Sequence, residues 1–224
     1  LVGYGFKEDA NEAEGHAIGG SSYLTRAVCV GRDAELATLQ SRWARAADGE
    51  AFALTIRGHA GAGKTRLVQE FVVQAKLDGG LVAEARCHDR VDAPFAALRS
   101  LIDPILRRPQ AAQVLRSLDD SGLIRLLTPV VDELDEPFPE TREFLDPSFA
   151  RERAYEVVAS WLSVLSEQSP LLIVVDDIQW CDSGSLDALT TLLLHQPEAK
   201  ILLVATERVE GTPPPPLIRG EVVA

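Results

Sequence analysis

Short apolar runs alternate with segments of helical periodicity along most of the chain. The runs that predict β-strands cover residues 51–58, 80–88, 170–177 and 199–206. Segments with apolar residues at helical spacing cover residues 33–46, 64–77, 148–168 and 183–196, and Asp33 is expected to cap the first of them. The third run is continuously apolar up to its two final aspartates, which is typical of a strand buried on both faces of a sheet, and the fourth is interpreted as another buried strand. The alternation predicts an α/β fold with a parallel sheet flanked by helices.

The connecting segments divide the chain further. Residues 1–26 are polar and glycine-rich and predict a flexible leader. Between Pro94 and about residue 134 the pattern predicts several short helices, which form an insertion between the second and third strands. Four consecutive prolines, 213–216, can continue neither a helix nor a strand. We therefore expect a core domain over residues 27–210 and a proline-rich tail over residues 211–224.

One segment fits neither periodicity. Residues 57–71, RGHAGAGKTRLVQEF, place three glycines, a lysine and a threonine between a strand and a helix. The part Gly58–Thr65 fits the motif G-x-x-x-x-G-K-[ST], in which the glycines let successive N–H groups turn toward phosphate oxygens. The N-terminus of the following helix adds its own unpaired N–H groups and its positive dipole end. The segment therefore predicts a P-loop.

The roles within this loop follow from its chemistry. Lys64 would reach the β- and γ-phosphates of ATP, and the Thr65 hydroxyl would bind Mg²⁺. His59 is expected only to line the loop. The residues expected to hold the nucleotide phosphates are Gly58, Gly61, Ala62, Gly63, Lys64, Thr65 and Arg66.

A second, acidic motif follows the third strand. The segment LLIVVDDIQWCD carries Asp176 and Asp177 to the edge of the sheet at which open α/β folds bind ligands. We interpret Asp176 as a Mg²⁺ ligand acting through water, and Asp177 as the general base that polarises the attacking water. The alternative is a strand end followed by a helix N-cap. After the fourth strand, Thr206 would lie beside the γ-phosphate and Arg208 could stabilise the transferring charge, although a surface arginine is common there.

The composition excludes some other functions. The 224 residues carry a net charge of −12 and a pI of about 4.8, without the clustered Lys and Arg that nucleic-acid binding needs. No apolar stretch reaches the ~18 residues of a membrane span, and no signal peptide is visible. Because Leu is residue 1 and the chain has no Met, we expect a fragment of a longer protein.

The cysteines indicate the redox environment. Cys29, Cys87 and Cys181 are odd in number and scattered in the sequence, which argues against a disulfide framework and fits a reducing, cytoplasmic setting. The pair Cys87-His88 has no partner at metal-ligand spacing.

Five segments together resemble a known family. They are VCVGRDAEL (28–36), the P-loop, DAPFAALRSL (92–101), PLLIVVDDIQWCDSGSL (170–186) and ILLVATER (201–208). In this order they resemble the AAA-type, STAND-related ATPase module grouped with origin-recognition-like AAA domains, over roughly residues 28–218. Such modules occur in large ATP-binding LuxR-type transcription regulators, in activators of the maltose-regulon type and beside class III adenylate cyclase domains.

The resemblance implies further site residues and marks departures. It places Val30, Gly31 and Arg32 near the adenine end of the nucleotide. Family members usually have Leu and His where this chain has Ile178 and Gln179, and Ala in place of Cys181. We interpret Trp180 as a packing residue. The family's fifth strand and helical lid would lie beyond residue 224.

The resemblance implies a strand order and a function. The strand over 51–57 should lie beside that over 199–206, followed by the Walker-B-type strand over 170–176, with the strand over 80–87 outermost. The other edge of strand 51–57 should stay unpaired unless the leader or the tail EVVA folds onto it, which would make the fragment prone to self-association. The expected function is an ATP-binding, slowly hydrolysing regulatory module whose partners are effector domains of a parent signalling protein. A P-loop small-molecule kinase and a non-hydrolysing nucleotide scaffold are the alternatives.

Overall fold

The computed structural model describes residues 31–89, 93–119, 122–134, 146–209 and 221–223. The predicted leader, Val30, most of the acidic segment 132–146 and most of the proline-rich tail lie outside these residues.

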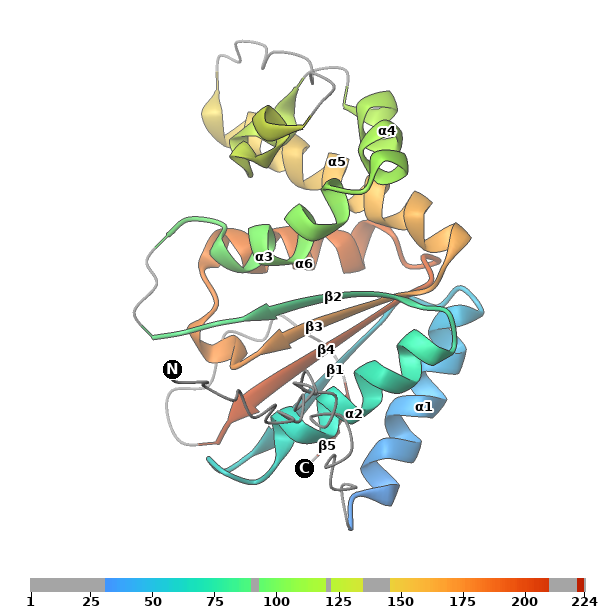
Figure 1. Cartoon of the computed structure of the whole chain (residues 1–224). Helices are drawn as coiled ribbons and strands as arrows, with labels where there is room; N and C mark the ends of the chain where they lie inside the picture. The colour runs from blue at the N-terminus through green and yellow to red at the C-terminus, as the bar shows by residue number, and fades with distance from the viewer. Residues whose placement is uncertain (1–30, 90–92, 120–121, 135–145, 210–220, 224) are drawn as a thin grey trace, which may run out of the picture.

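A parallel sheet organises the described part of the chain (Figure 1). Its strands are β1 (Phe52–Gly58), β2 (Leu81–Arg86), β3 (Leu171–Asp176), β4 (Ile201–Arg208) and β5 (Glu221–Val223). Their order across the sheet is β2-β3-β4-β1-β5, and all the pairings are parallel. The predicted fold class and the predicted order of the first four strands are therefore confirmed.

Strand β5 gives β1 a partner on its outer edge. Its three residues pair with Leu54, Thr55 and Ile56 of β1. The sequence analysis allowed for a tail folded onto this edge, and the structure has this arrangement. The edge of β1 is therefore paired at these three positions.

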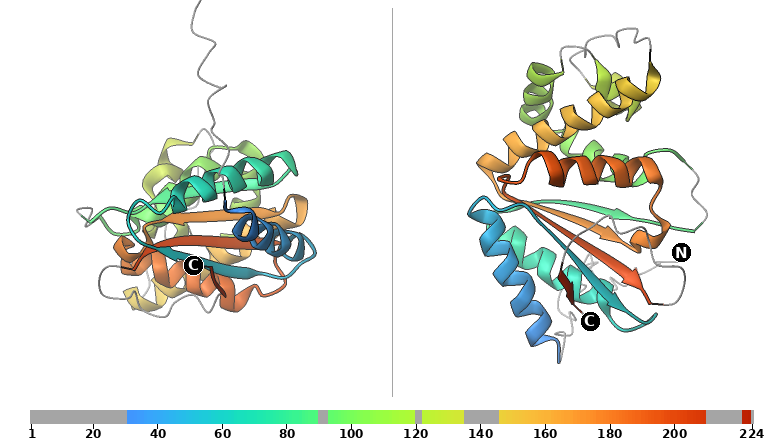
Figure 2. Two further views of the ribbon diagram at one scale, coloured as in Figure 1. Left: turned by 90° about the horizontal axis from the view of Figure 1, so that it is seen from below. Right: turned by 180° about the vertical axis from the view of Figure 1, so that it is seen from behind.

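Helices cover both faces of the sheet (Figures 1 and 2). On one face lie α1 (Asp33–Ala47) and α2 (Lys64–Leu77), and on the other lie α3 (Ala96–Leu106) and α6 (Ser183–His195). Alternate residues of β3 point to opposite faces, so that Ile173 packs in one core cluster and Leu172 in the other. This two-sided burial explains the continuous apolar run that the strand shows in the sequence.

The predicted helical insertion forms an additional layer over α3 and α6. It contains α4 (Pro109–Leu118) and the short 3₁₀ helices η1 (Leu123–Leu126) and η2 (Pro129–Glu133), and the long α5 (Pro147–Gln168) follows it. The indole of Trp161, a fully buried residue of α5, donates to the carbonyl of Ala111 in α4 at 2.8 Å. None of the helices in the described part of the chain has the length and apolarity to cross a bilayer.

Two local expectations are corrected. The cap of α1 is Arg32, and Asp33 is the first helical residue, where its negative charge suits the helix dipole. The fourth strand continues to Arg208, two residues beyond its apolar run, because β1 and β4 stay paired as far as Gly58 and Arg208.

Candidate nucleotide site

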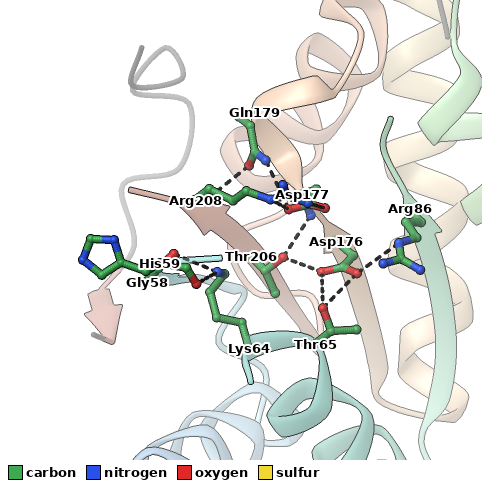
Figure 3. A network of polar contacts seen from close by, with 10 residues as sticks. All are labelled: Gly58, His59, Lys64, Thr65, Arg86, Asp176, Asp177, Gln179, Thr206 and Arg208. Carbon is green, nitrogen blue, oxygen red and sulfur yellow. Dashed lines mark hydrogen bonds and ion pairs between the residues drawn. The ribbon is translucent and has the colours of Figure 1, made fainter. Parts of the chain in front are cut away.

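The carboxyl ends of the central strands meet at one edge of the sheet. The pairing places Gly58 opposite Arg208 and Arg86 opposite Asp176. Figure 3 shows the polar side chains that gather there, beside the N-terminus of α2. We call the group of Arg86, Asp176, Asp177, Gln179, Thr206 and Arg208 the acidic edge, and residues 58–65 the phosphate loop.

The phosphate loop has the backbone that its glycines permit. Gly61 and Gly63 adopt positive φ of 78° and 82°, and Gly63 caps α2. A Cβ atom added to either glycine would meet no atom within 4 Å, so these positions need glycine because of their backbone conformation and not for lack of space. The first N–H groups of α2 have no acceptor within the helix and face this loop.

Lys64 lies across the loop. Its ammonium group donates to the carbonyl of Gly58 at 2.7 Å and to that of His59 at 2.9 Å (Figure 3). The lysine charge is therefore held at the mouth of the loop. Arg66 lies on the first turn of α2, and Ala62 closes a turn on His59 through a 3.2 Å hydrogen bond.

Thr65 faces the acidic edge. Its hydroxyl lies 3.2 Å from each carboxylate oxygen of Asp176, although the two residues are 111 positions apart. A hydroxyl and a carboxylate are hard oxygen donors of the kind that Mg²⁺ prefers. The donor set at this point therefore fits the metal that the sequence predicted there.

Thr206 connects the two aspartates. Its hydroxyl donates to Asp176 at 2.5 Å and accepts from the backbone N–H of Asp177 at 2.9 Å. The side chain is 1% exposed. Arg86 adds a positive charge 3.5 Å from the outer oxygen of Asp176. Asp176 is thus held by hydrogen bonds from β4 and α2 and by an ion pair from β2.

Asp177 is held differently, by a clamp from β4. Arg208 donates to its two oxygens from Nε and Nη2 at 3.0 and 2.9 Å, and Gln179 donates at 3.1 Å. Burial opposes ionisation, but the hydrogen bonds from Arg208 and Gln179 outweigh it and hold the pKa of Asp177 below its ordinary value. The residue adopts φ 56°, a left-handed conformation that Asp tolerates better than most residues.

Of the residues expected near the adenine end of the nucleotide, Gly31 and Arg32 lie within the described residues. Val30 lies outside them. Arg32 donates to the carbonyl of Ala62 at 2.9 Å and pairs with Glu35, which ties the start of α1 to the phosphate loop. The structure therefore brings Arg32 to the loop.

Sequence reasoning missed Arg86, Gln179 and Asp182. Asp182 caps α6 through Ser185 at 2.9 Å and also accepts from the N–H groups of Phe95 and Ala97 at 3.0 and 3.3 Å. The sequence offers a cap signal in DSGS, but the contact with α3 depends on tertiary packing.

Trp180 is not the packing residue that the sequence suggested. It is 47% exposed and lines an open cavity of about 720 Å³ beside the acidic edge. The cavity lies between the loop after β2, the start of α5 and the start of α6, where Arg151, Tyr155 and Cys181 also contribute to the wall. Within the described residues, no cluster of three or more His, Cys, Asp or Glu suits a metal ion.

A comparison with protein families matches residues 28–204 to the AAA ATPase domain. The chain belongs to this family. Membership implies nucleotide binding, with the usual dependence on Mg²⁺, and supports P-loop ATPase activity in general. Among curated proteins, no sequence matches the chain significantly.

Several solved structures are similar to this AAA ATPase domain. They include a chain of Drosophila ORC bound to DNA, with 16% identity, 80% of this chain and 81% of that chain covered, and a TM-score of 0.40. For Cdc6p from Pyrobaculum aerophilum the identity is 17%, the coverage 84% and 41%, and the TM-score 0.49. A DNA replication initiation factor has 15% identity, coverage of 82% and 40%, and a TM-score of 0.35. The AAA ATPase domain thus spans about two fifths of the last two proteins.

Proposed function

We propose that this AAA ATPase domain binds Mg-ATP between the phosphate loop and the acidic edge and hydrolyses it slowly. One observation carries the proposal, namely the approach of the Thr65 hydroxyl to both carboxylate oxygens of Asp176 at 3.2 Å. A P-loop threonine and an acidic residue at the end of another strand of the same sheet are the two protein groups that position Mg²⁺ in P-loop NTPases.

The main chain of the loop and Lys64 would hold the phosphates. The N–H groups at the start of α2 and the loop glycines supply fixed dipoles, and Lys64 supplies the charge for the β- and γ-phosphates. Bound Mg²⁺ would neutralise developing phosphate charge. Thr65 and Asp176 would hold this metal, the latter through water.

Asp177 is our proposed general base, and its surroundings support slow turnover. A base works best when its pKa lies near the working pH, whereas the Arg208 clamp lowers the pKa of Asp177. Arg208 lies at the same edge of the sheet as Asp177, to which it donates from Nε and Nη2. Its charge would also stabilise transferring phosphate charge there.

The biological context is a further part of this proposal. We place the domain in a larger signalling or transcription-regulator protein, in which ATP binding and hydrolysis switch attached effector domains. The resemblance carried by GRDAEL and DDIQWCD supports this context. A small-molecule kinase would instead produce ADP only when its acceptor is added, and a non-hydrolysing scaffold would fail to release phosphate in a single-turnover assay.

Calorimetry with Mg-ATP tests the nucleotide site. We expect Lys64→Ala to weaken binding by about 10- to 100-fold, since it removes a charged hydrogen-bond donor from the phosphates. Lys76→Ala is the matched control, because Lys76 lies on the same helix and pairs only loosely, at 3.4 Å, with the exposed Glu84. Equal affinities of the wild type and Lys64→Ala, or equal losses in the two variants, would contradict the assignment.

A further inference from the structure

Two cysteines that are far apart in the sequence lie together behind the acidic edge. Cys87 directly follows β2, and Cys181 directly follows the 3₁₀ helix η3 (Ile178–Trp180). The two thiols are within hydrogen-bonding distance of each other. Both cysteines are free in the structure.

The backbone fixes both partners of this pair. The N–H of Cys87 donates to the carbonyl of Asp176 at 2.9 Å, which extends the β2–β3 pairing by one residue. The N–H of Cys181 donates to the carbonyl of Ile178 at 2.9 Å and closes the turn after Asp177. The side chains therefore meet across two anchored segments, so that little backbone entropy opposes a bond between them.

The two thiols differ in their access to solvent. Cys87 is buried, with 6% of its surface exposed, whereas Cys181 is half-buried and lines the open cavity beside Trp180. A small oxidant can thus reach Cys181 through the cavity, and Cys87 is the thiol next to it. Two adjacent thiols, one of them open to solvent, can be oxidised to a disulfide and reduced again.

We propose that Cys87 and Cys181 are a dithiol modification site that a peroxide converts to an intramolecular disulfide. Hydrogen peroxide first oxidises one of the two thiols to a sulfenic acid and releases one water. The sulfur of the other cysteine then attacks this oxidised sulfur, the S–S bond forms, and the sulfenic oxygen leaves as a second water. Two thiols lose two electrons and two protons, and one peroxide is reduced to two waters. A dithiol reductant reverses the change.

The disulfide would tie the loop after Asp177 to the end of β2. This loop carries Gln179, whose amide donates to Asp177. The disulfide would therefore restrain a residue that positions Asp177, and it would not involve the phosphate loop. Cys181→Ala removes one thiol of the pair with a small change of side-chain volume and is a suitable control substitution.

Mass spectrometry of the whole chain tests the site. A Cys29→Ser background removes the third thiol. After treatment with hydrogen peroxide and digestion without reductant, we expect a peptide that links Cys87 to Cys181 and has lost two hydrogens. We also expect the melting temperature of the oxidised protein to rise by about 5–10 °C, because the bond closes a long loop of the unfolded chain. Dithiothreitol should reverse both changes.

The controls separate this site from general oxidation. In Cys181→Ala and Cys87→Ala, neither the linked peptide nor the rise in melting temperature should occur. A mixture of ¹⁴N- and ¹⁵N-labelled protein shows whether a link joins one chain or two. A link only between chains, or sulfinic acid on Cys181 with Cys87 still a thiol, would overturn the proposal.

Discussion

The two halves of the candidate site are built in different ways. The phosphate loop is one continuous segment, and its parts are main-chain N–H groups, two glycines at positive φ and a single lysine. The acidic edge is assembled from the ends of three strands and one short loop, and its parts are side chains that hydrogen-bond to one another. The first half needs only local geometry, whereas the second exists only when β2, β3 and β4 are paired.

We expect this difference to separate binding from turnover. Substitutions in the phosphate loop should weaken the hold on the phosphates and leave the fold intact, because the loop contributes little to either core cluster. Substitutions in the acidic edge should affect hydrolysis or stability, because Asp176, Asp177 and Thr206 are buried and depend on one another and on their neighbours for hydrogen bonds. The three predictions that follow test this separation.

The largest effect is expected for Asp177→Asn. Loss of the proposed general base should slow ATP hydrolysis by ~10²–10⁴-fold. Binding of Mg-ATP should change little, since the proposed holders of the phosphates and the metal are the phosphate loop and Asp176, not Asp177. Asn is a suitable substitute because it tolerates the left-handed backbone at this position. Single-turnover phosphate release measures the rate, and hydrolysis at the wild-type rate would show that Asp177 is not the base.

A smaller effect, on stability, is expected for Thr206→Val. Valine keeps the shape of the side chain but leaves the buried N–H of Asp177 and one oxygen of Asp176 without the hydroxyl. We expect the free energy of unfolding to fall by about 1–3 kcal/mol, the usual cost of an unsatisfied buried polar group. Urea denaturation measures this quantity. Thr206→Ser keeps the hydroxyl and should lose clearly less, so an equal loss in both variants would argue against the hydrogen-bond network.

The smallest effect is expected in the pH dependence of stability. The pKa of Asp177 is lowered from its ordinary value of 3.8 in the folded protein, so its ion pair with Arg208 stabilises the fold above about pH 4. This contribution is lost as the pH falls through the lower, folded-state pKa. The difference in unfolding free energy between the wild type and Asp177→Asn should therefore be larger at pH 7 than at pH 3. A difference that grows on acidification would contradict the ion-pair assignment.

The sequence by itself determined the elements and the phosphate loop. Apolar runs and helical spacing located the first four strands and the main helices, since a helix or strand buried on one or both faces needs apolar residues at regular positions in the sequence. The motif at residues 58–65 was recognisable because the whole phosphate loop is formed by eight adjacent residues. Asp176 and Asp177 were found because both stand at the end of a buried apolar run.

Only the tertiary structure decided which side chains meet. Arg86 gives no local signal, because its partner Asp176 lies on another strand. Gln179 also accepts from the backbone N–H of Arg208, a contact that depends on β4 lying beside it. Cys87 and Cys181 looked scattered in the sequence, yet the pairing of β2 with β3 brings their thiols together. The pairing of β5 with β1 also joins segments separated by more than half the chain. Hydrophobic patterning is a property of each segment alone, whereas such contacts depend on which strand lies beside which.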